Sequence, residues 1–145
     1  MYKHILVATD GSELADKAVD HGIALAKALG SKLTIITVTE PWATLAPADF
    51  TVAFPIEDYE RAAKESAAKI LDQAVGKAKA GGVTCATLHV ADRYPADGIL
   101  EAATAAGADL IVMASHGRRG VARMLIGSQT NRVVVHSTIP VLVCR

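Results

Sequence analysis

Short apolar runs alternate with longer amphipathic stretches along the whole chain. The runs are rich in β-branched residues, which is typical of strands buried in a parallel sheet. The longer stretches repeat apolar residues at the spacing of one helix face. Strands are predicted at Lys3–Thr9, Lys32–Val38, Val83–Val90, Asp109–Met113 and Pro140–Cys144. Helices are predicted at Glu13–Leu29, about Glu57–Ala80, Pro95–Ala106 and Gln129–His136. This order predicts one α/β domain over residues 1–145, a doubly wound parallel sheet with helices on both faces.

The first two predicted helices show their ends and their buried faces. Ser12 is a candidate N-cap of the first helix and Gly30 a candidate C-cap, while Gly81-Gly82 ends the second helix. The apolar stripe of the first helix is Ala15, Ala18, Val19, Gly22, Ile23, Ala26 and Leu29. That of the second is Ala63, Ala67, Ile70, Leu71, Ala74 and Ala78. We expect both stripes to pack on the sheet.

A long connection from Thr39 to Ile56 interrupts the regular alternation. It contains three prolines and the aromatic residues Trp42, Phe50 and Phe54. A loop of this length is often a lid or an interaction surface. The alternative is that its aromatic residues pack the loop onto the body of the domain. The sequence leaves both interpretations open.

The segment from Met113 to Ser128, MASHGRRGVARMLIGS, carries the clearest chemistry in the chain. It places a glycine-bearing loop after a buried strand and a Gly-Ser pair before a helix, whose first N–H groups and dipole attract anions. At Gly117 a side chain would stand between the backbone N–H groups and a phosphate. Helix N-terminal amides and hydroxyls would come from Gly127, Ser128, Gln129 and Thr130. One such glycine alone would indicate a turn or a cap, but the spaced set predicts a phosphate site.

Other polar residues of this loop have two interpretations. Arg118, Arg119 and Arg123 could lie over a triphosphate as charged donors, or they could form a solvated basic loop. His116 has no neighbouring carboxylate in the sequence to orient it as a general base, so we expect it to serve in hydrogen bonding. Ser115 lacks the Gly-x-Ser-x-Gly elbow of a hydrolase, and adjacent side chains rarely face each other. The sequence therefore predicts no strong catalysis.

Both ends of the chain resemble the universal stress protein family. Gly117, nine residues and Gly127-Ser128, closed by Thr138–Val143, are similar to the C-terminal signature of that family. Ile5–Ser12 resembles its opening strand and turn. The nucleotide-binding members carry Gly-x2-Gly-x9-Gly-Ser/Thr, and here the first glycine position is Ala114. The resemblance covers essentially the whole chain.

The resemblance implies a five-stranded, Rossmann-like sheet of order 3-2-1-4-5, in which ligands bind where strands one and four lie side by side. It implies an adenine nucleotide, ATP or else AMP or cyclic AMP, with Mg²⁺ able to accompany the phosphates. Asp10 and the backbone of Val38 would hold ribose and adenine, although Asp10 could instead cap the following helix. The same pocket would be lined by Ala8, Thr9, Met113 and Ala114. A competing class is a homodimeric interaction protein of this fold that binds no nucleotide.

The departure at Ala114 bears on ligand binding. If the family glycine only provides room beside the ribose, one methyl group costs little. If it provides a positive φ, alanine is strained by roughly 1 kcal/mol or more. Because Ala114 directly follows a β-rich strand, we expect the first case.

Composition restricts the partners. The 145 residues are 51% hydrophobic and carry a formal net charge of zero, which gives no electrostatic reason to expect nucleic acid or an anionic membrane as partner. No run approaches the roughly 18 to 20 apolar residues that span a bilayer, and no signal-peptide pattern precedes the first strand, so we expect a cytoplasmic protein. Cys85 and Cys144 share no metal-ligand spacing and are expected to be buried, reduced thiols.

Other nucleotide-binding and signalling classes lack their motifs here. There is no Gly-x4-Gly-Lys-Ser/Thr and no Gly-x-Gly-x2-Gly after the first strand. A receiver domain would need an acidic cluster, but only Asp10 follows strand one, and no lysine follows the last strand.

The apolar strand Ile139–Cys144 would form a sheet edge, and members of the family dimerise through it. We therefore predict a homodimeric, ATP-binding stress-response module with at most slow ATP hydrolysis.

Overall fold

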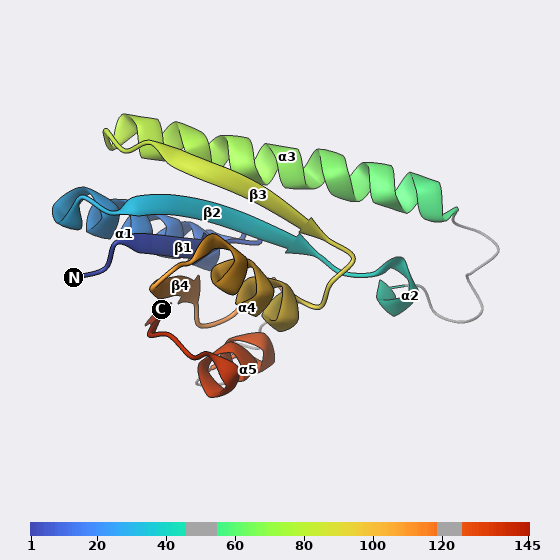
Figure 1. Ribbon diagram of the computed structural model, residues 1–145. Coiled ribbons are helices and arrows are strands. Elements are labelled where there is room, and N and C mark those ends of the chain that lie inside the picture. The colour runs from blue at the N-terminus through green and yellow to red at the C-terminus, as the bar shows by residue number, and fades with distance from the viewer. Residues whose placement is uncertain (46–54, 119–125) are drawn as a thin grey trace.

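The computed structural model describes residues 1–45, 55–118 and 126–145. The strands are β1 (His4–Ala8), β2 (Lys32–Thr39), β3 (Cys85–Ala91), β4 (Leu110–Ala114) and β5 (Val141–Cys144). The helices are α1 (Glu13–Leu29), α2 (Trp42–Leu45), α3 (Ile56–Ala80), α4 (Pro95–Ala106) and α5 (Ser128–His136) (Figure 1). Every predicted strand and helix is present, and only the short helix α2 was not predicted from the sequence.

The strands form one parallel sheet of order β3-β2-β1-β4-β5. Ile5 of β1 pairs with Leu33 of β2 on one side and with Leu110 of β4 on the other. This topology confirms the predicted order 3-2-1-4-5. It also places the carboxyl ends of β1 and β4 next to each other, where the two halves of the sheet diverge.

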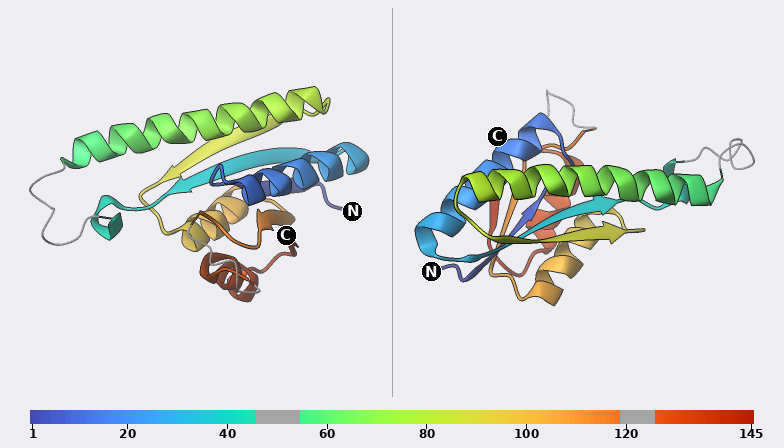
Figure 2. Two further views of the ribbon diagram at one scale, coloured as in Figure 1. Left: turned by 180° about the vertical axis from the view of Figure 1, so that it is seen from behind. Right: turned by 90° about the horizontal axis from the view of Figure 1, so that it is seen from above.

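Helices cover both faces of the sheet, α1 and α3 on one face and α4 and α5 on the other (Figure 2). The alternation of β1 shows the division: Ile5 and Val7 pack with α1 and α3, whereas Leu6 and Ala8 pack with α4 and α5. All five residues of β4 are buried, as expected for a central strand. The predicted Rossmann-like α/β fold is confirmed.

The edge strand β3 is less covered than the sequence suggests. Ala86, Thr87 and Leu88 are exposed, and 46% of Leu88 is accessible to solvent. Helix α4 packs against β2 and α5, so the far side of β3 receives little cover. The expectation of a sheet buried on both faces therefore holds for the central strands and is wrong for β3.

The caps of α1 follow the sequence. The Oγ of Ser12 accepts a hydrogen bond from the backbone N of Ala15 at 3.3 Å, and Gly30 has the left-handed φ of 65° that lets it end the helix. The predicted stripe of α1 is buried except for Leu29, which is 43% exposed. Leu29 occupies the last position of the helix, beyond the region that the sheet covers.

The first residues of the connection from β2 to α3 include a short helix. Thr39 belongs to β2, and α2 is a four-residue helix that starts at Trp42. The hydroxyl of Tyr59 donates to the carbonyl oxygen of Glu40 at 2.6 Å and ties the start of the connection to α3. Phe50 and Phe54 lie outside the described residues, so the choice between a lid and a packed loop stays open.

Both cysteines are free, as predicted. Cys144 is buried and Cys85 is partly buried, and burial raises the pKa of each thiol. Among the residues that the structure describes, no helix is long and apolar enough to cross a membrane.

Candidate functional site

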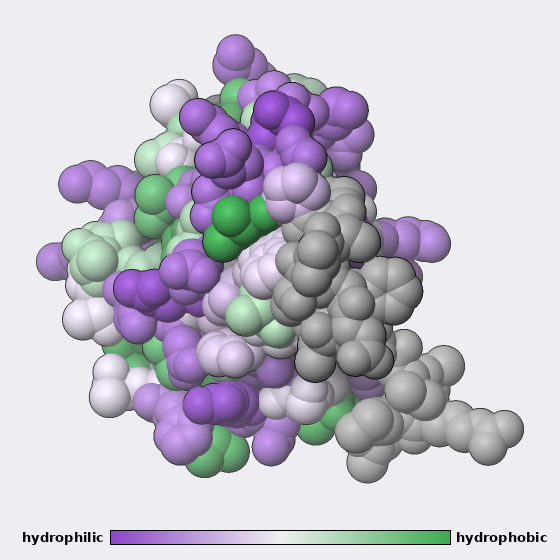
Figure 3. Space-filling view, turned by 90° about the vertical axis from the view of Figure 1, so that its right-hand side faces the viewer, coloured by the Kyte–Doolittle hydropathy of each residue, from purple (hydrophilic) through white to green (hydrophobic). Residues whose placement is uncertain are grey.

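A cavity of about 490 Å³ opens at the carboxyl edge of the sheet, beside the N-termini of α4 and α5. Figure 3 faces this edge, where weakly polar side chains lie among hydrophilic ones. Every residue that the sequence analysis placed in the site lines this cavity: Ala8, Thr9, Asp10, Val38, Met113, Ala114, Gly117, Arg118, Gly127, Ser128, Gln129 and Thr130. The fold thus brings together segments that are far apart in the sequence.

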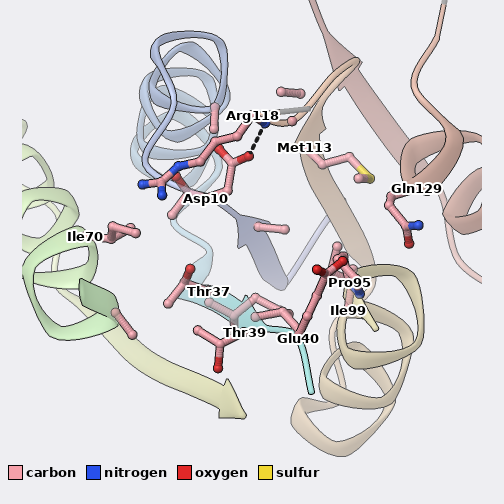
Figure 4. A pocket seen from close by; sticks show the side chains of 18 of the residues that line it. Asp10, Thr37, Thr39, Glu40, Ile70, Pro95, Ile99, Met113, Arg118 and Gln129 are labelled. Carbon is pink, nitrogen blue, oxygen red and sulfur yellow. Dashed lines mark hydrogen bonds between the residues drawn. The ribbon is translucent and has the colours of Figure 1, made fainter. Parts of the chain in front are cut away.

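Asp10 joins the turn after β1 to the loop after β4. Its Oδ1 accepts a hydrogen bond from the backbone N of Ser12 at 3.0 Å, and its Oδ2 accepts one from the backbone N of Arg118 at 2.7 Å (Figure 4). Ser12 is the N-cap of α1, so the alternative that Asp10 caps this helix is wrong. The carboxylate instead holds two loops at the mouth of the cavity.

Gly117 lies against this carboxylate. A Cβ atom at Gly117 would be 2.8 Å from Oδ2 of Asp10, so a side chain there would make either this carboxylate or the loop shift. The sequence analysis explained this glycine by the approach of a phosphate. The structure adds a second reason, the close packing of the loop on Asp10.

Gly127 brings the start of α5 close to the same loop. Its backbone N donates to the carbonyl oxygen of Ser115 at 2.6 Å, and an added Cβ would lie 3.0 Å from that oxygen. As the N-cap of α5, Gly127 offers no side-chain hydrogen bond. The N–H groups of Ser128 and Gln129 have no partner within the helix. The amino end of α5 can therefore donate to an anion in the cavity.

The side chains at the start of α5 have structural partners. The hydroxyl of Thr130 is buried and donates to the carbonyl oxygen of Ala114 at 2.8 Å. Its proton is therefore committed to β4, and not to a phosphate as the sequence suggested. The Oε1 of Gln129 accepts from the backbone N of Ala96 at 3.1 Å. Gln129 thus satisfies the first turn of α4, whose N-cap Tyr94 makes no side-chain hydrogen bond.

The backbone of Val38 faces the cavity. The carbonyl oxygen of Ile36 accepts from the backbone N of Thr9 at 2.9 Å, so Ile36 presents its backbone groups toward β1. Successive residues of a strand direct their backbone groups to opposite neighbours, and Val38, two positions after Ile36, therefore presents its groups to the same side as Ile36. Since β1 ends at Ala8, these groups of Val38 lie beyond the last paired residue.

Ala114 is the last residue of β4 and is extended. Among the described residues, Asp92 is the only one other than glycine with a positive φ, so the backbone of Ala114 is not strained. The expectation that alanine replaces the family glycine without a conformational cost is confirmed. Its side chain is 7% exposed and belongs to the core cluster under α1 and α3.

Ser115 and His116 do face each other, contrary to the expectation from the sequence. The Oγ of Ser115 lies 3.0 Å from Nδ1 of His116, and Ser115 is 3% exposed. The Nε2 of His116 is buried and has no hydrogen-bond partner among the described residues. A buried hydroxyl is not accessible as a nucleophile, and the carboxylate of Asp10 bonds to backbone amides. The pair makes no catalytic triad.

Arg118 is exposed, and its guanidinium extends over Gly11 toward Ile70 (Figure 4). A Cβ atom added to Gly11 would lie 3.2 Å from Nη2 of Arg118 and 2.8 Å from a side-chain carbon of Ile70. The guanidinium therefore lies on the side of the cavity that faces α3. Arg119 and Arg123 lie outside the described residues.

Across residues 1–45, 55–118 and 126–145, no group of three or more His, Cys, Asp or Glu side chains could hold a metal.

Sequence reasoning missed one wall of the cavity. This wall comes from α3 and from the side of β2 that faces it: Thr37, Thr39, Tyr59, Ala63, Ser66, Ala67 and Ile70. Ala63 and Ile70 were assigned to the apolar stripe that packs on the sheet, but both are only half-buried. The small size of Ala63 and Ser66 was the available signal. The remaining lining residues that were not predicted are Ala15, Ile36, Glu40, Pro95, Ile99 and His116.

The sequence pattern of the universal stress protein family matches residues 1–145. The chain belongs to this family. It is 36% identical to the universal stress protein YxiE of Bacillus subtilis (strain 168), over the full length of both chains. The fold is similar to that of the universal stress protein UspA from Lactobacillus plantarum, with a TM-score of 0.85, 26% identity and coverage of 99% of this chain and 98% of the other.

One solved structure of this family bears on the cavity. It is described as a universal stress protein in complex with cAMP. Our chain is 29% identical to that protein, with a TM-score of 0.71. The match covers 99% of our chain and 97% of the other.

Proposed function

We propose that this universal stress protein binds an adenine nucleotide, ATP in the first place, in the cavity at the carboxyl edge of the sheet. The observation that carries the proposal is the uncapped amino end of α5 at Gly127, held beside Gly117 in one cavity with Asp10. A helix N-terminus without a side-chain cap is a ready site for phosphate. A similar protein in complex with cAMP supports an adenine nucleotide as the ligand.

The cavity offers suitable groups for each part of the ligand. The phosphates would accept from the first amides of α5, from the hydroxyl of Ser128 and from Arg118. The carboxylate of Asp10 has lone pairs left for ribose hydroxyls. The base would lie in the apolar part formed by Val38, Met113 and their neighbours, beside the backbone groups of Val38. These apolar residues pack with α4 and α5, so the base would enter on that face of the sheet.

The same geometry argues for a binding module. ATP hydrolysis needs a water molecule activated beside the terminal phosphate. The side chains of Ser115 and His116 are hydrogen-bonded to each other and not directed at such a water. We therefore propose at most slow hydrolysis, with Mg²⁺ brought by the phosphates. Nucleotide occupancy would act on the assembly or the partner contacts of a cytoplasmic protein.

The assembly we propose is a homodimer through Ile139–Cys144. In the described residues β5 pairs with β4 alone, and Leu142 is 37% exposed. An apolar edge strand of this kind pairs readily with another chain. The alternative function, a dimeric interaction protein without nucleotide, would use the same strand and leave the cavity unused.

The test begins with the purified protein. Small molecules released on denaturation are separated by chromatography, and the emptied protein is titrated with ATP, AMP and cyclic AMP by calorimetry. Saturable binding that is lost in Gly127→Val is the expected result, because the new side chain would meet the carbonyl oxygen of Ser115. If none of the three nucleotides binds, the interaction protein is the better description.

A further inference from the structure

The cavity extends along both faces of the sheet. Ile36 belongs to the cluster under α4 and α5, and Val38 packs against that cluster. Because side chains alternate along a strand, Thr37 and Thr39 point to the opposite face, toward α3. The part of the cavity on this face, which we call the α3 lobe, is lined by Ala15, Thr37, Thr39, Tyr59, Ala63, Ser66, Ala67 and Ile70.

Thr37 is the polar centre of the α3 lobe. It is 2% exposed, and its hydroxyl has no hydrogen-bond partner among the described residues. Figure 4 shows the Thr37 hydroxyl directed into the cavity, whereas the hydroxyl of Thr39 points away from it. The Oγ1 of Thr39 lies 2.8 Å from Nε2 of His89 on β3. Because the Thr37 hydroxyl faces the cavity and makes no hydrogen bond within the described residues, it can bond to a hydroxyl or carbonyl of a ligand.

The α3 lobe is open because α3 carries small side chains there. Ala63 and Ser66 lie one turn apart and face β2, where larger residues would fill the space. Ala67 is buried and forms the floor. The stripe of small residues would mean little alone, but it surrounds the unpartnered hydroxyl of Thr37.

The chemistry of the lobe restricts its occupant. Its walls carry hydroxyls and alkyl groups, and its lining holds no aspartate, glutamate or lysine among the described residues. The guanidinium of Arg118 extends toward Ile70 at the lobe's entrance, which disfavours a cationic group (Figure 4). The same arginine connects the lobe to the phosphate cradle, because its backbone N bonds to Asp10. An uncharged, hydroxyl-bearing group attached beyond the phosphates of a nucleotide suits this position.

We propose that the α3 lobe binds an uncharged sugar-like group, so that the preferred ligand is an adenosine diphosphate that carries such a group on its terminal phosphate. The inference rests on the proposed nucleotide site, since the adenosine and the phosphates would occupy the other part of the cavity. Thr37 is then the specificity-determining residue for the added group. No bond is made or broken.

The experiment compares ADP, ATP and ADP-ribose by calorimetry on the emptied full-length protein. Thr37→Val removes the hydroxyl at nearly constant shape, and Ala63→Leu fills the lobe. Ala62→Leu, on the exposed side of the same helix turn, is the control. We expect ADP-ribose to bind about tenfold more tightly than ADP to the unchanged protein and to Ala62→Leu. Both lobe variants should lose this advantage, while their affinities for ADP and ATP stay within about twofold.

Equal affinities for ADP and ADP-ribose would overturn the proposal and leave the nucleotide site intact. So would an equal loss of all three ligands in Thr37→Val, because the hydroxyl would then act on the common part of the ligand. A preference for ATP that depends on Thr37 would assign the lobe to a third phosphate and also overturn it. Absence of binding by all three ligands would reject the proposed function itself.

Discussion

The carboxylate of Asp10 accepts a 2.7 Å hydrogen bond from the backbone N–H of Arg118, 108 positions later in the chain. This bond connects the turn after β1 to the loop after β4 across the divergence of the sheet. The loop passes so close to the carboxylate that a Cβ atom at position 117 would lie 2.8 Å from Oδ2 of Asp10. The arrangement of the proposed phosphate site at Gly117 and Gly127 therefore depends on a contact between two distant loops.

Gly117→Ala tests this dependence. The new Cβ would lie 2.8 Å from Oδ2 of Asp10, so either the loop or the carboxylate must move, and the hydrogen bond between them is strained. We expect the affinity for ATP, measured by calorimetry, to fall at least about tenfold, a loss of about 1.4 kcal/mol. Circular dichroism should show unchanged secondary structure. An affinity equal to that of the unchanged protein would mean that the position of this loop does not matter for binding.

Gly76→Ala is both a control and a prediction of its own. Gly76 lies within α3, and an added Cβ would meet no atom within 4 Å. Alanine loses less conformational entropy than glycine on helix formation, so we expect a gain of about 0.5–1 kcal/mol in the free energy of unfolding. Urea denaturation measures the gain. ATP affinity should not change, and a destabilised variant would contradict the packing of α3 described above.

Ala114→Gly restores the glycine of the nucleotide-binding family pattern. Because Ala114 is extended and its methyl group packs in the core, its removal should lower the free energy of unfolding by about 1 kcal/mol. We expect ATP affinity to stay within about threefold. A rise in affinity well beyond this range, measured by calorimetry, would show that the methyl group obstructs the ligand.

His89 makes stability depend on pH. Burial, together with the nearby charge of Lys64, lowers the pKa of His89 below its ordinary value of 6.5. The unfolded chain therefore binds this proton at a higher pH than the folded chain does, and stability is lost as the pH falls through 6.5 toward the folded pKa. His89→Gln should lose less stability between pH 7.5 and 5.5 than the unchanged protein. Parallel losses in thermal denaturation would contradict this assignment.

Leu142→Lys and Val143→Lys test the proposed dimer. Leu142 is exposed and Val143 is half-buried, so a charge at Leu142 disturbs the fold less. We expect Leu142→Lys to give a folded monomer in analytical ultracentrifugation, since a charge on an edge strand opposes pairing. Val143→Lys should give a monomer or an aggregate. Leu88→Lys on the opposite edge is the matched control, and an unchanged dimer in Leu142→Lys would reject β5 as the interface.

The sequence predicted the strands and helices well because their signals are local. Ser12 and Gly30 mark the ends of α1 through the geometry of single residues. The buried run of β4 is visible in consecutive apolar letters. The residues of the candidate site could be predicted because the topology collects the carboxyl ends of parallel strands at one edge. Their functional roles remain predictions.

The sequence by itself thus determined the α/β alternation, the strand order through its family resemblance, and the segments that meet at the cavity. Only the tertiary structure decided that Ile70 faces the cavity while Leu71 faces the core, because both fit the same helical stripe. It also decided that Gly117 lies against the carboxylate of Asp10 and that Thr37 is buried beside the cavity. Burial and hydrogen-bond partners depend on neighbours that are distant in the chain, and a local pattern does not contain them.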